Sequence, residues 1–269
     1  MNLGQGTIGD GAVAVAVRAA EKVFPNGTRA LSPIDLTVRQ GEFLSLIGPS
    51  GCGKSTLLKL IANFYDTTAG SLAWWQGDFS KVGQPGRRLA FVFQEPTLMP
   101  WARVAANVRL ALDLEKQDGE DPAAKVAAAL KQVGLADFAG SYPRQLSGGM
   151  KMRVSIARAL IDRPDLLLMD EPFGALDEFT RNKLDLDLVQ LAWQRRLTTL
   201  FVTHSIYEAV FLSTRIVVMA ANPGRIFGEL VVDEPQPREE GFRNSLRFVK
   251  TCQELSAMLA EASRQRLDA

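Results

Sequence analysis

Short hydrophobic runs recur along the chain and carry most of its structural signal. They are mostly aliphatic or β-branched, and turn-forming or polar residues bound them, which is typical of buried strands. Glycine and proline mark several boundaries, as at Pro25-Asn26-Gly27 and Asn222-Pro223-Gly224. We predict strands at Val13–Val17, Ile34–Val38, Phe43–Ile47, Leu89–Phe93, Leu166–Asp170, Thr199–Thr203 and Ile216–Met219.

Helical patterns lie between several of these runs. Lys54–Tyr65 and Thr180–Gln194 both repeat hydrophobic residues at the spacing of an amphipathic helix. Strands that alternate with helices favour parallel pairing and a sheet covered on both faces, so the pattern predicts an α/β fold. The segment from Trp101 to about Arg163 is rich in Ala and Leu without a convincing strand, and we predict a helical insertion, 101–163.

Length and boundaries suggest one main domain. A chain of 269 residues gives a prior of one to two domains. We expect a flexible glycine-containing N-terminus at 1–12, a main domain at 13–235 and a C-terminal helical tail at 236–269. The N-terminus lacks the positive start of a signal peptide, and no run reaches the roughly 18 apolar residues that cross a bilayer.

Charge and cysteine content narrow the class of protein. The chain has 31 basic and 30 acidic side chains, a net charge of +1, which argues against a protein that works by coating nucleic acid. The two cysteines, Cys52 and Cys252, cannot build a disulfide framework and suit a reducing cytosol. Hydrophobic residues make up 46% of the chain, which is ample for a packed core.

A glycine-rich segment follows the run Phe43–Ile47 and opens a helical pattern. Backbone N–H groups in such a loop converge on phosphate oxygens, and the helix N-terminus adds positive potential. We therefore predict that Lys54 reaches the β- and γ-phosphates of a nucleotide and that Ser55 ligates Mg²⁺. The alternative is a plain glycine-rich turn. The segment is Gly48-Pro49-Ser50-Gly51-Cys52-Gly53-Lys54-Ser55-Thr56, in which Cys52 is interpreted as a small filler.

Two consecutive carboxylates, Asp170 and Glu171, end another hydrophobic run. Asp170 can hold Mg²⁺ through water, and Glu171 is placed to polarise an attacking water. A phosphotransferase has no need to activate water, so Glu171 favours hydrolysis. The alternative is that the pair merely caps the next turn.

Between these motifs stands Leu146-Ser147-Gly148-Gly149-Met150, and here the sequence resembles the ATP-binding cassette (ABC) family. The family signature is typically Leu-Ser-Gly-Gly-Gln, so Met150 is a departure. The resemblance implies that Ser147, Gly148 and Gly149 contact the γ-phosphate of ATP held by another subunit, in a head-to-tail dimer. Without the resemblance, Ser-Gly-Gly is a weak signal of an ordinary helix start.

Four more positions match the family in order. The resemblance implies that Gln94, after a strand, contacts Mg²⁺ and the attacking water, and that His204, the single histidine, positions Glu171. It also implies that Asp177 organises the opposing site and that Phe24 stacks on adenine. Taken alone, these would be a surface amide, a structural histidine, a helix N-cap and a core aromatic residue.

The resemblance covers about Val13 to Gly224 and implies a fold. We expect a P-loop NTPase core of the ABC type, with a mixed sheet flanked by helices, an N-terminal antiparallel β portion and an inserted α-helical subdomain. The expected activity is an ATPase that uses ATP and Mg²⁺. Leu98, Met99 and Trp101 belong to an apolar loop that we interpret as a docking surface for a membrane permease. The alternative is that this loop packs against the helical insertion itself.

Further motifs resemble those of the nitrate, sulfonate and taurine importer group. They are Met99-Pro100-Trp101, Pro172-Phe173-Gly174-Ala175-Leu176-Asp177, and Met219 through Asn222-Pro223-Gly224-Arg225-Ile226 followed by Asp233-Glu234-Pro235. That resemblance implies a second copy of the chain, two transmembrane permease subunits and, indirectly, a periplasmic or lipid-anchored solute-binding protein, but no nucleic acid. It places the chain peripherally on the cytoplasmic face of the bacterial inner membrane. The alternatives are a soluble ABC ATPase of translation or DNA repair, and a small-molecule kinase that shares only the phosphate loop.

Overall fold

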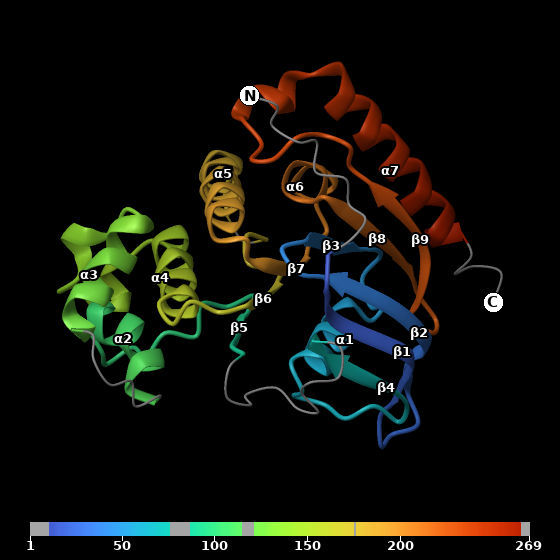
Figure 1. The fold of residues 1–269 in the computed structure, drawn as a ribbon, viewed down its shortest axis with the longest axis horizontal. Helices are drawn as coiled ribbons and strands as arrows, with labels where there is room; N and C mark the ends of the chain where they lie inside the picture. The colour runs from blue at the N-terminus through green and yellow to red at the C-terminus, as the bar shows by residue number, and fades with distance from the viewer. Residues whose placement is uncertain (1–10, 76–86, 115–120, 175, 265–269) are drawn as a thin grey trace.

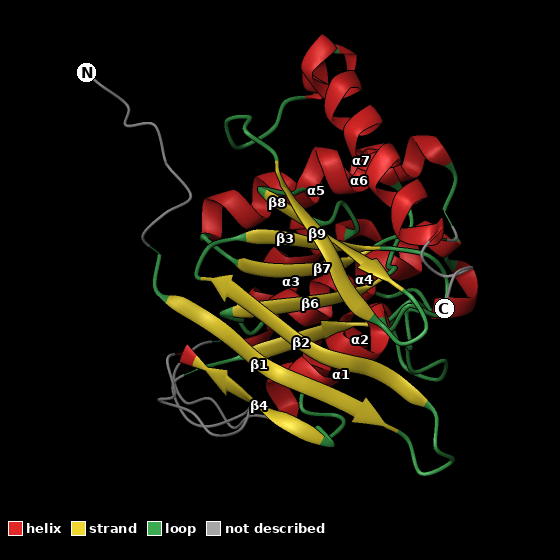
Figure 2. Ribbon diagram, turned by 90° about the vertical axis from the view of Figure 1, so that its right-hand side faces the viewer, coloured by secondary structure: helices red, strands yellow, loops and turns green. Residues whose placement is uncertain are grey.

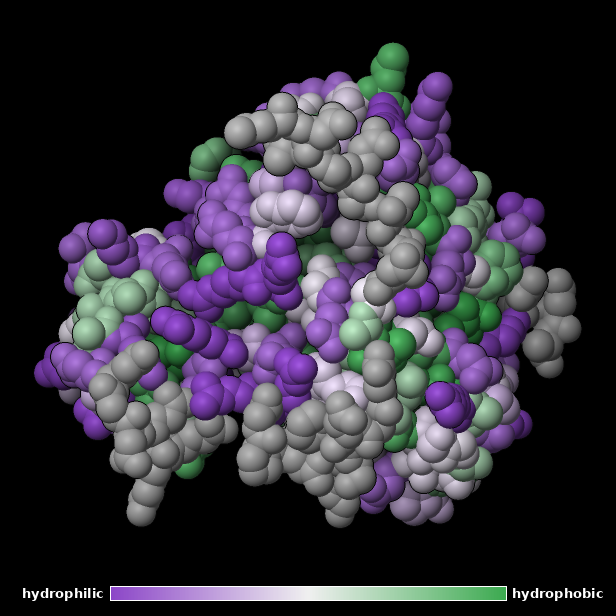
Figure 3. Space-filling view, viewed as in Figure 1, coloured by the Kyte–Doolittle hydropathy of each residue, from purple (hydrophilic) through white to green (hydrophobic). Residues whose placement is uncertain are grey.

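The structure is a computed structural model that describes residues 11–75, 87–114, 121–174 and 176–264. The expected flexible N-terminus at 1–12 therefore lies almost wholly outside the described residues. Within these ranges, no helix is both long and apolar enough to cross a membrane. Hydrophilic side chains cover much of the face shown in Figure 3, and hydrophobic ones emerge there in small groups.

A six-stranded sheet organises the molecule. Its order is β5-β6-β7-β3-β8-β9, and all neighbours pair in parallel except β8 and β9. Every residue of β3, β6 and β7 is buried, because layers of other elements cover both faces of the sheet. The strands are β3 (Phe43–Ile47), β5 (Leu89–Val92), β6 (Leu166–Asp170), β7 (Thr198–Val202), β8 (Arg215–Ala220) and β9 (Arg225–Val231).

Alternate residues of the central strand face two different cores. Leu44 and Leu46 of β3 pack towards α1 (Lys54–Ile61) and a second sheet, whereas Phe43 and Ile47 pack towards the helices on the opposite face. The second sheet has the order β2-β1-β4 and is antiparallel; it crosses the central strands in Figure 2. Its strands are β1 (Val13–Val23), β2 (Arg29–Arg39) and β4 (Ala69–Trp74).

Helices on the opposite face include the C-terminal one. The helix α7 (Leu246–Arg264) lies along β8, β9 and α6 (Figure 1), and its buried residues join the same core as those of α5 and α6. The short 3₁₀ helix η4 (Glu240–Asn244) precedes it. The two other helices of this layer are α5 (Glu178–Arg195) and α6 (Ile206–Leu212).

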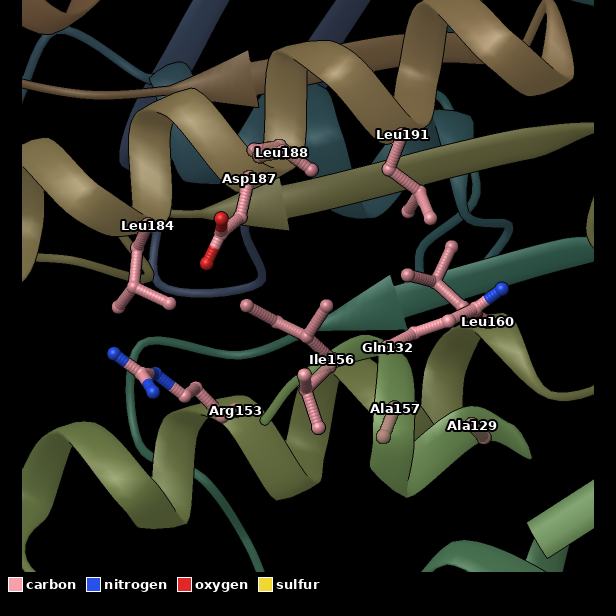
Figure 4. A pocket seen from close by; sticks show the side chains of 11 residues that line it. Ala129, Gln132, Arg153, Ile156, Ala157, Leu160, Leu184, Asp187, Leu188 and Leu191 are labelled. Atoms are coloured by element: carbon pink, nitrogen blue, oxygen red, sulfur yellow. The ribbon is translucent and has the colours of Figure 1, made fainter. Parts of the chain in front are cut away.

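The segment predicted as a helical insertion forms a separate lobe beside the sheet (Figure 1). Its helices share a core of their own. The lobe meets the main body where α4 faces α5 across an apolar pocket, with Arg153 and Asp187 at one end (Figure 4). Its elements are α2 (Val104–Leu114), α3 (Pro122–Gln132), η2 (Ala136–Phe138), η3 (Pro143–Gln145) and α4 (Gly148–Leu160).

Two strands were not predicted, although the expected mixed sheet and the expected N-terminal antiparallel β portion are both present. The strands β4 and β9 are half-exposed, so their sequences lack the continuous hydrophobic run by which the buried strands were recognised. The antiparallel β9 and the separate antiparallel sheet make the architecture mixed. The helix predicted at Lys54–Tyr65 ends at Ile61.

Candidate functional site

The loop between β3 and α1 has the backbone of a phosphate cradle. Gly53 precedes α1 with φ of 91°, a conformation that residues with a side chain rarely adopt. A Cβ on Gly53 would lie 2.4 Å from Leu31 Cδ2 and 3.1 Å from the Ala30 carbonyl oxygen. The loop therefore needs glycine at this position both for its conformation and for its packing against β2.

Lys54 is buried at the start of α1. Its Nζ donates to the carbonyl oxygens of Gly48 at 2.8 Å and Pro49 at 3.3 Å, so the ammonium lies within the loop. Burial raises the pKa of the neighbouring Cys52 thiol, although Lys54 opposes the shift. A fully buried thiol that stays protonated is a poor nucleophile, which agrees with a filler role for Cys52.

Ser55 and Asp170 meet between α1 and the end of β6. Ser55 Oγ donates to Asp170 Oδ1 at 2.7 Å, and burial raises the pKa of Asp170 despite this hydrogen bond. A hydroxyl and a carboxylate are the oxygen donors that Mg²⁺ prefers. No group of three or more His, Cys, Asp or Glu in the described ranges could enclose a metal ion, so a cation beside this pair would need phosphate or water oxygens as well. The residues present fit such a shared site.

Glu171 and His204 come together because β6 and β7 are parallel neighbours that end at the same edge. The N–H of Glu171 donates to Val202 O at 3.0 Å, and the residue adopts φ of 45°. Its Oε2 lies 3.1 Å from His204 Nδ1. The carboxylate is thus directed towards a histidine that is itself 58% exposed and open to a ligand.

A cleft of about 350 Å³ lies in front of the phosphate loop. Loop residues and Glu171 line one side. The other walls come from Thr28–Ala30, where the β1–β2 turn enters β2, and from Asn222–Gly224 in the β8–β9 turn. Sequence reasoning assigned neither group of residues to the site, and in these two turns it selected only Phe24. The lining residues are Thr28, Arg29, Ala30, Ser50, Gly51, Gly53, Lys54, Ser55, Thr56, Glu171, Asn222, Pro223 and Gly224.

Gly224 explains why the β8–β9 turn reaches the cleft. Its N–H donates to Ala30 O at 3.1 Å, and its carbonyl accepts from the backbone N–H of Ser32 at 2.9 Å. A Cβ here would lie 2.4 Å from Cys52 O. The only signal in the sequence was the Asn222-Pro223-Gly224 turn after a buried strand, which indicates a turn and not a binding wall.

The signature residues stand at a helix start outside this cleft. Ser147 is the N-cap of α4, and its Oγ accepts from Met150 N at 3.3 Å. Gly148 is exposed, and a Cβ on it would meet nothing within 4 Å. A Cβ on Gly149 would lie 2.9 Å from Thr180 Cγ2, so α4 begins beside α5. None of these three residues lines the cleft of the same chain.

Asp177 is the N-cap of α5. Its Oδ1 accepts from Thr180 N at 2.9 Å, and this hydrogen bond lowers the pKa of the carboxyl group. Asp177 is exposed and also lies outside the cleft. The observed contacts are those of a helix cap, and its expected role towards an opposing site stays a prediction.

Gln94 and Phe24 also remain predictions. Gln94 is exposed just after β5, and the pairing of Val92 with Met169 places it near the edge where Asp170 ends β6. The Phe24 ring packs edge-on against Tyr65, with centroids 5.7 Å apart. Phe24 is not among the lining residues of the cleft.

Comparison with known proteins places these features in a family. The family model described as "ABC transporter" matches residues 31–174. The aliphatic sulfonates import ATP-binding protein SsuB of Bacillus licheniformis is 43% identical over 231 residues, covering 84% of this chain and 88% of that protein. The bicarbonate transport ATP-binding protein CmpC of Synechococcus elongatus is 47% identical over 84% of this chain, which spans only 34% of that protein.

A solved structure shows the same fold. The ATP-binding cassette MJ0796, in a dimeric post-hydrolysis state bound to ADP and Pi, matches with a TM-score of 0.73 and 31% identity. The match covers 81% of this chain and 98% of that one. The predicted α/β cassette architecture is confirmed by this likeness.

Proposed function

The chain belongs to the ABC transporter family of ATP-binding proteins, and we propose that it is the ATP-hydrolysing subunit of an importer for a small solute of the nitrate, sulfonate or taurine type. The contact between Glu171 and His204, beside the Ser55–Asp170 pair, carries the proposal. Relatives named for the import of sulfonates and the transport of bicarbonate support a small-solute importer. None of the relatives named above supports a role in translation or DNA repair.

The residues that line the cleft and those at the neighbouring strand ends have separate roles in hydrolysis. Gln94, Asp170 and His204 belong to the second group and are not among the lining residues. Backbone N–H groups of residues 50–54 and the Lys54 ammonium bind the phosphates, which fixes the γ-phosphate at the end of β3. Glu171 orients the attacking water and accepts its proton, while His204 holds the Glu171 carboxylate in place. Ser55, Asp170 and Gln94 would hold Mg²⁺, which neutralises phosphate charge when bound.

A second copy of the chain would complete the site. Ser147, Gly148, Gly149 and Asp177 lie outside the cleft of their own chain, yet an exposed helix start with free N–H groups is suited to phosphate. A head-to-tail dimer would bring these residues to the ATP bound by the partner. The dimeric form of the cassette MJ0796 supports this arrangement.

The apolar loop after Gln94 is the proposed permease contact. Trp101 is 77% exposed, and Leu98 and Met99 are half-buried beside it along the chain. An exposed indole is typical of an interface anchor. We place the chain on the cytoplasmic face of the inner membrane, bound to two permease subunits that receive solute from a periplasmic or lipid-anchored binding protein.

ATPase measurements on three variants test the proposal. Glu171→Gln should keep ATP binding and lose nearly all hydrolysis, because an amide cannot accept the proton of water. His204→Ala should lose most hydrolysis, whereas Cys52→Ser, which changes a buried filler in the loop, should retain it. Wild-type turnover by Glu171→Gln would refute the role of Glu171 as the base. Loss of activity in Cys52→Ser would refute the filler role of Cys52.

A further inference from the structure

A cluster of charged side chains lies in the core between the C-terminal segment and the helices α5 and α6, close to the end of β7 that leads to His204. It contains two carboxylates, Asp185 of α5 and Glu208 of α6, and two guanidinium groups, Arg181 of α5 and Arg243 of η4. Asp185 is fully buried and Glu208 nearly so. The two guanidinium groups are only partly buried, with 25% of the Arg181 side chain and 15% of the Arg243 side chain exposed. Burying the two carboxylates is costly unless cations pair with them, so the arrangement constrains the elements that carry these groups.

Arg243 ties the C-terminal segment to both helices. Its Nη2 donates to Asp185 Oδ2 at 2.6 Å, and its guanidinium stacks on the Phe211 ring of α6 with 3.8 Å between Cζ and the ring centroid. One side chain of η4 thereby contacts both α5 and α6. The segment expected only as a peripheral tail thus reaches the interior of the molecule.

The second half of the cluster reaches the turn that carries His204. Arg181 Nε lies 3.3 Å from Glu208 Oε1, and the Thr203 hydroxyl donates a hydrogen bond to Glu208 Oε2. Thr203 Oγ1 in turn accepts from the N–H of Ser205 at 2.9 Å. The residues on both sides of His204 are therefore linked to the Glu208 carboxylate, which forms an ion pair with Arg181.

The charges in this cluster depend on one another. Burial and the neighbouring Glu208 raise the pKa of Asp185 to about 7, and Arg243 and Arg181 oppose the shift. Asp185 Oδ1 and Glu208 Oε1 are both buried without a hydrogen-bond partner among the described residues. Arg243 also favours the charged form of Glu208. Loss of Arg243 would therefore leave Asp185 protonated and favour protonation of Glu208, which would weaken the hold of the Glu208 carboxylate on Thr203.

We propose that Arg243 is a positioning residue for ATP hydrolysis, which acts through Asp185, Arg181 and Glu208 to fix the turn that presents His204 to Glu171. The C-terminal segment is then part of the catalytic apparatus and not only a cover for the core. This inference rests on the proposed function of His204. It assigns no contact with ATP to Arg243.

The steady-state ATPase activity of the purified chain tests the coupling. We expect Arg243→Ala to lower kcat by about tenfold while KM for ATP changes less than about twofold, since the loss is one of orientation. Arg247→Ala is the matched control, because Arg247 pairs with the exposed Asp233 further along the same segment. Equal kcat in the two variants would overturn the proposal.

Two double variants separate positioning from general destabilisation. In a His204→Ala background, Arg243→Ala should lower the residual rate less than about twofold, because residues that act as one unit are not additive. Adding Asp185→Asn to Arg243→Ala should lower kcat less than about twofold further, because Asp185 has already lost its partner there. The same fold loss with and without His204, or a further large loss with Asp185→Asn, would contradict the coupling.

If Arg243→Ala does not fold, the same test can be made with Arg243→Lys, which keeps the positive charge. It should lower kcat severalfold in the wild-type chain and leave the residual rate of His204→Ala unchanged; equal losses in both backgrounds would overturn the proposal. Full activity of His204→Ala would refute the proposed function itself. Loss of activity in His204→Ala together with normal activity in every Arg243 variant would refute only the coupling.

Discussion

Replacing Gly224 by Ala tests whether the β8–β9 turn is a structural wall of the nucleotide cleft. The new Cβ would lie 2.4 Å from Cys52 O and 2.7 Å from Ala30 O, both backbone atoms that no side-chain rotation can move away. The turn and the phosphate loop must therefore separate by on the order of 1 Å. This displacement would stretch three hydrogen bonds, from Gly224 N to Ala30 O and from the Ser32 N–H and hydroxyl to Gly224 O.

The expected magnitude follows from these contacts. Three weakened hydrogen bonds at about 1 kcal/mol each, with overpacking strain of about 1–3 kcal/mol, should lower the free energy of unfolding by about 2–4 kcal/mol after partial relaxation. Because Cys52 O belongs to the phosphate loop, we also expect the Kd for ATP to rise by about tenfold.

Urea unfolding without nucleotide and fluorescence titration with an ATP analogue measure the two effects. Gly241→Ala is the control, because Gly241 is exposed and a Cβ there meets nothing within 4 Å. It should leave both quantities near their wild-type values. A Gly224→Ala protein whose unfolding free energy lies within about 0.5 kcal/mol of wild type, and which binds ATP normally, would refute the reasoning.

Two further predictions concern Asp185 and Arg238, buried charged residues on the face of the six-stranded sheet that α5, α6 and α7 cover. The pKa of Asp185 rises from 3.8 to about 7 on folding, so the folded chain holds the proton more tightly. The free energy of unfolding should therefore fall as the pH rises from about 4 to 7, by up to about 4 kcal/mol from this group, and Asp185→Asn should flatten that slope in urea unfolding measured against pH. Arg238 is fully buried and donates to the carbonyl groups of Val210, Phe211 and Ser213 among others, so Arg238→Met should cost about 3–5 kcal/mol in the same assay. An Arg238→Met loss no larger than that of the exposed Arg247→Met would contradict this account.

Strands could be predicted from the sequence where the hydrophobic pattern of the strand itself is sufficient to identify it. The strands β3, β6 and β7 are buried along their whole length, so each appears as an unbroken hydrophobic run. The strands β4 and β9 expose much of their surface, and polar and glycine residues interrupt their hydrophobic pattern. The pattern therefore did not identify them as strands. The mixed direction of the sheet depends on such edge strands, which a hydrophobic pattern alone does not reveal.

The same distinction applies to the site. The phosphate loop and the Asp170-Glu171 pair are contiguous motifs, so their roles could be predicted from their own residues, and these roles stay predictions. The cleft walls at 28–30 and 222–224 arise because distant turns pack against that loop, as Gly224 does on Cys52. Asp185 and Arg243 form their ion pair across 58 positions, so no local pattern indicates it.

We propose that each ATP is hydrolysed between the phosphate loop of one chain and the signature residues Ser147–Gly149 of another. Mixing two inactive variants, so that each supplies what the other lacks, tests this proposal most directly. Lys54→Ala should disable the loop, and Ser147→Arg should block the signature, so each variant alone should be inactive. In a mixture, each heterodimer would join one intact loop to one intact signature, and activity should return to roughly a quarter of wild type for random pairing. A mixture no more active than the two separate variants would contradict a site shared between two chains.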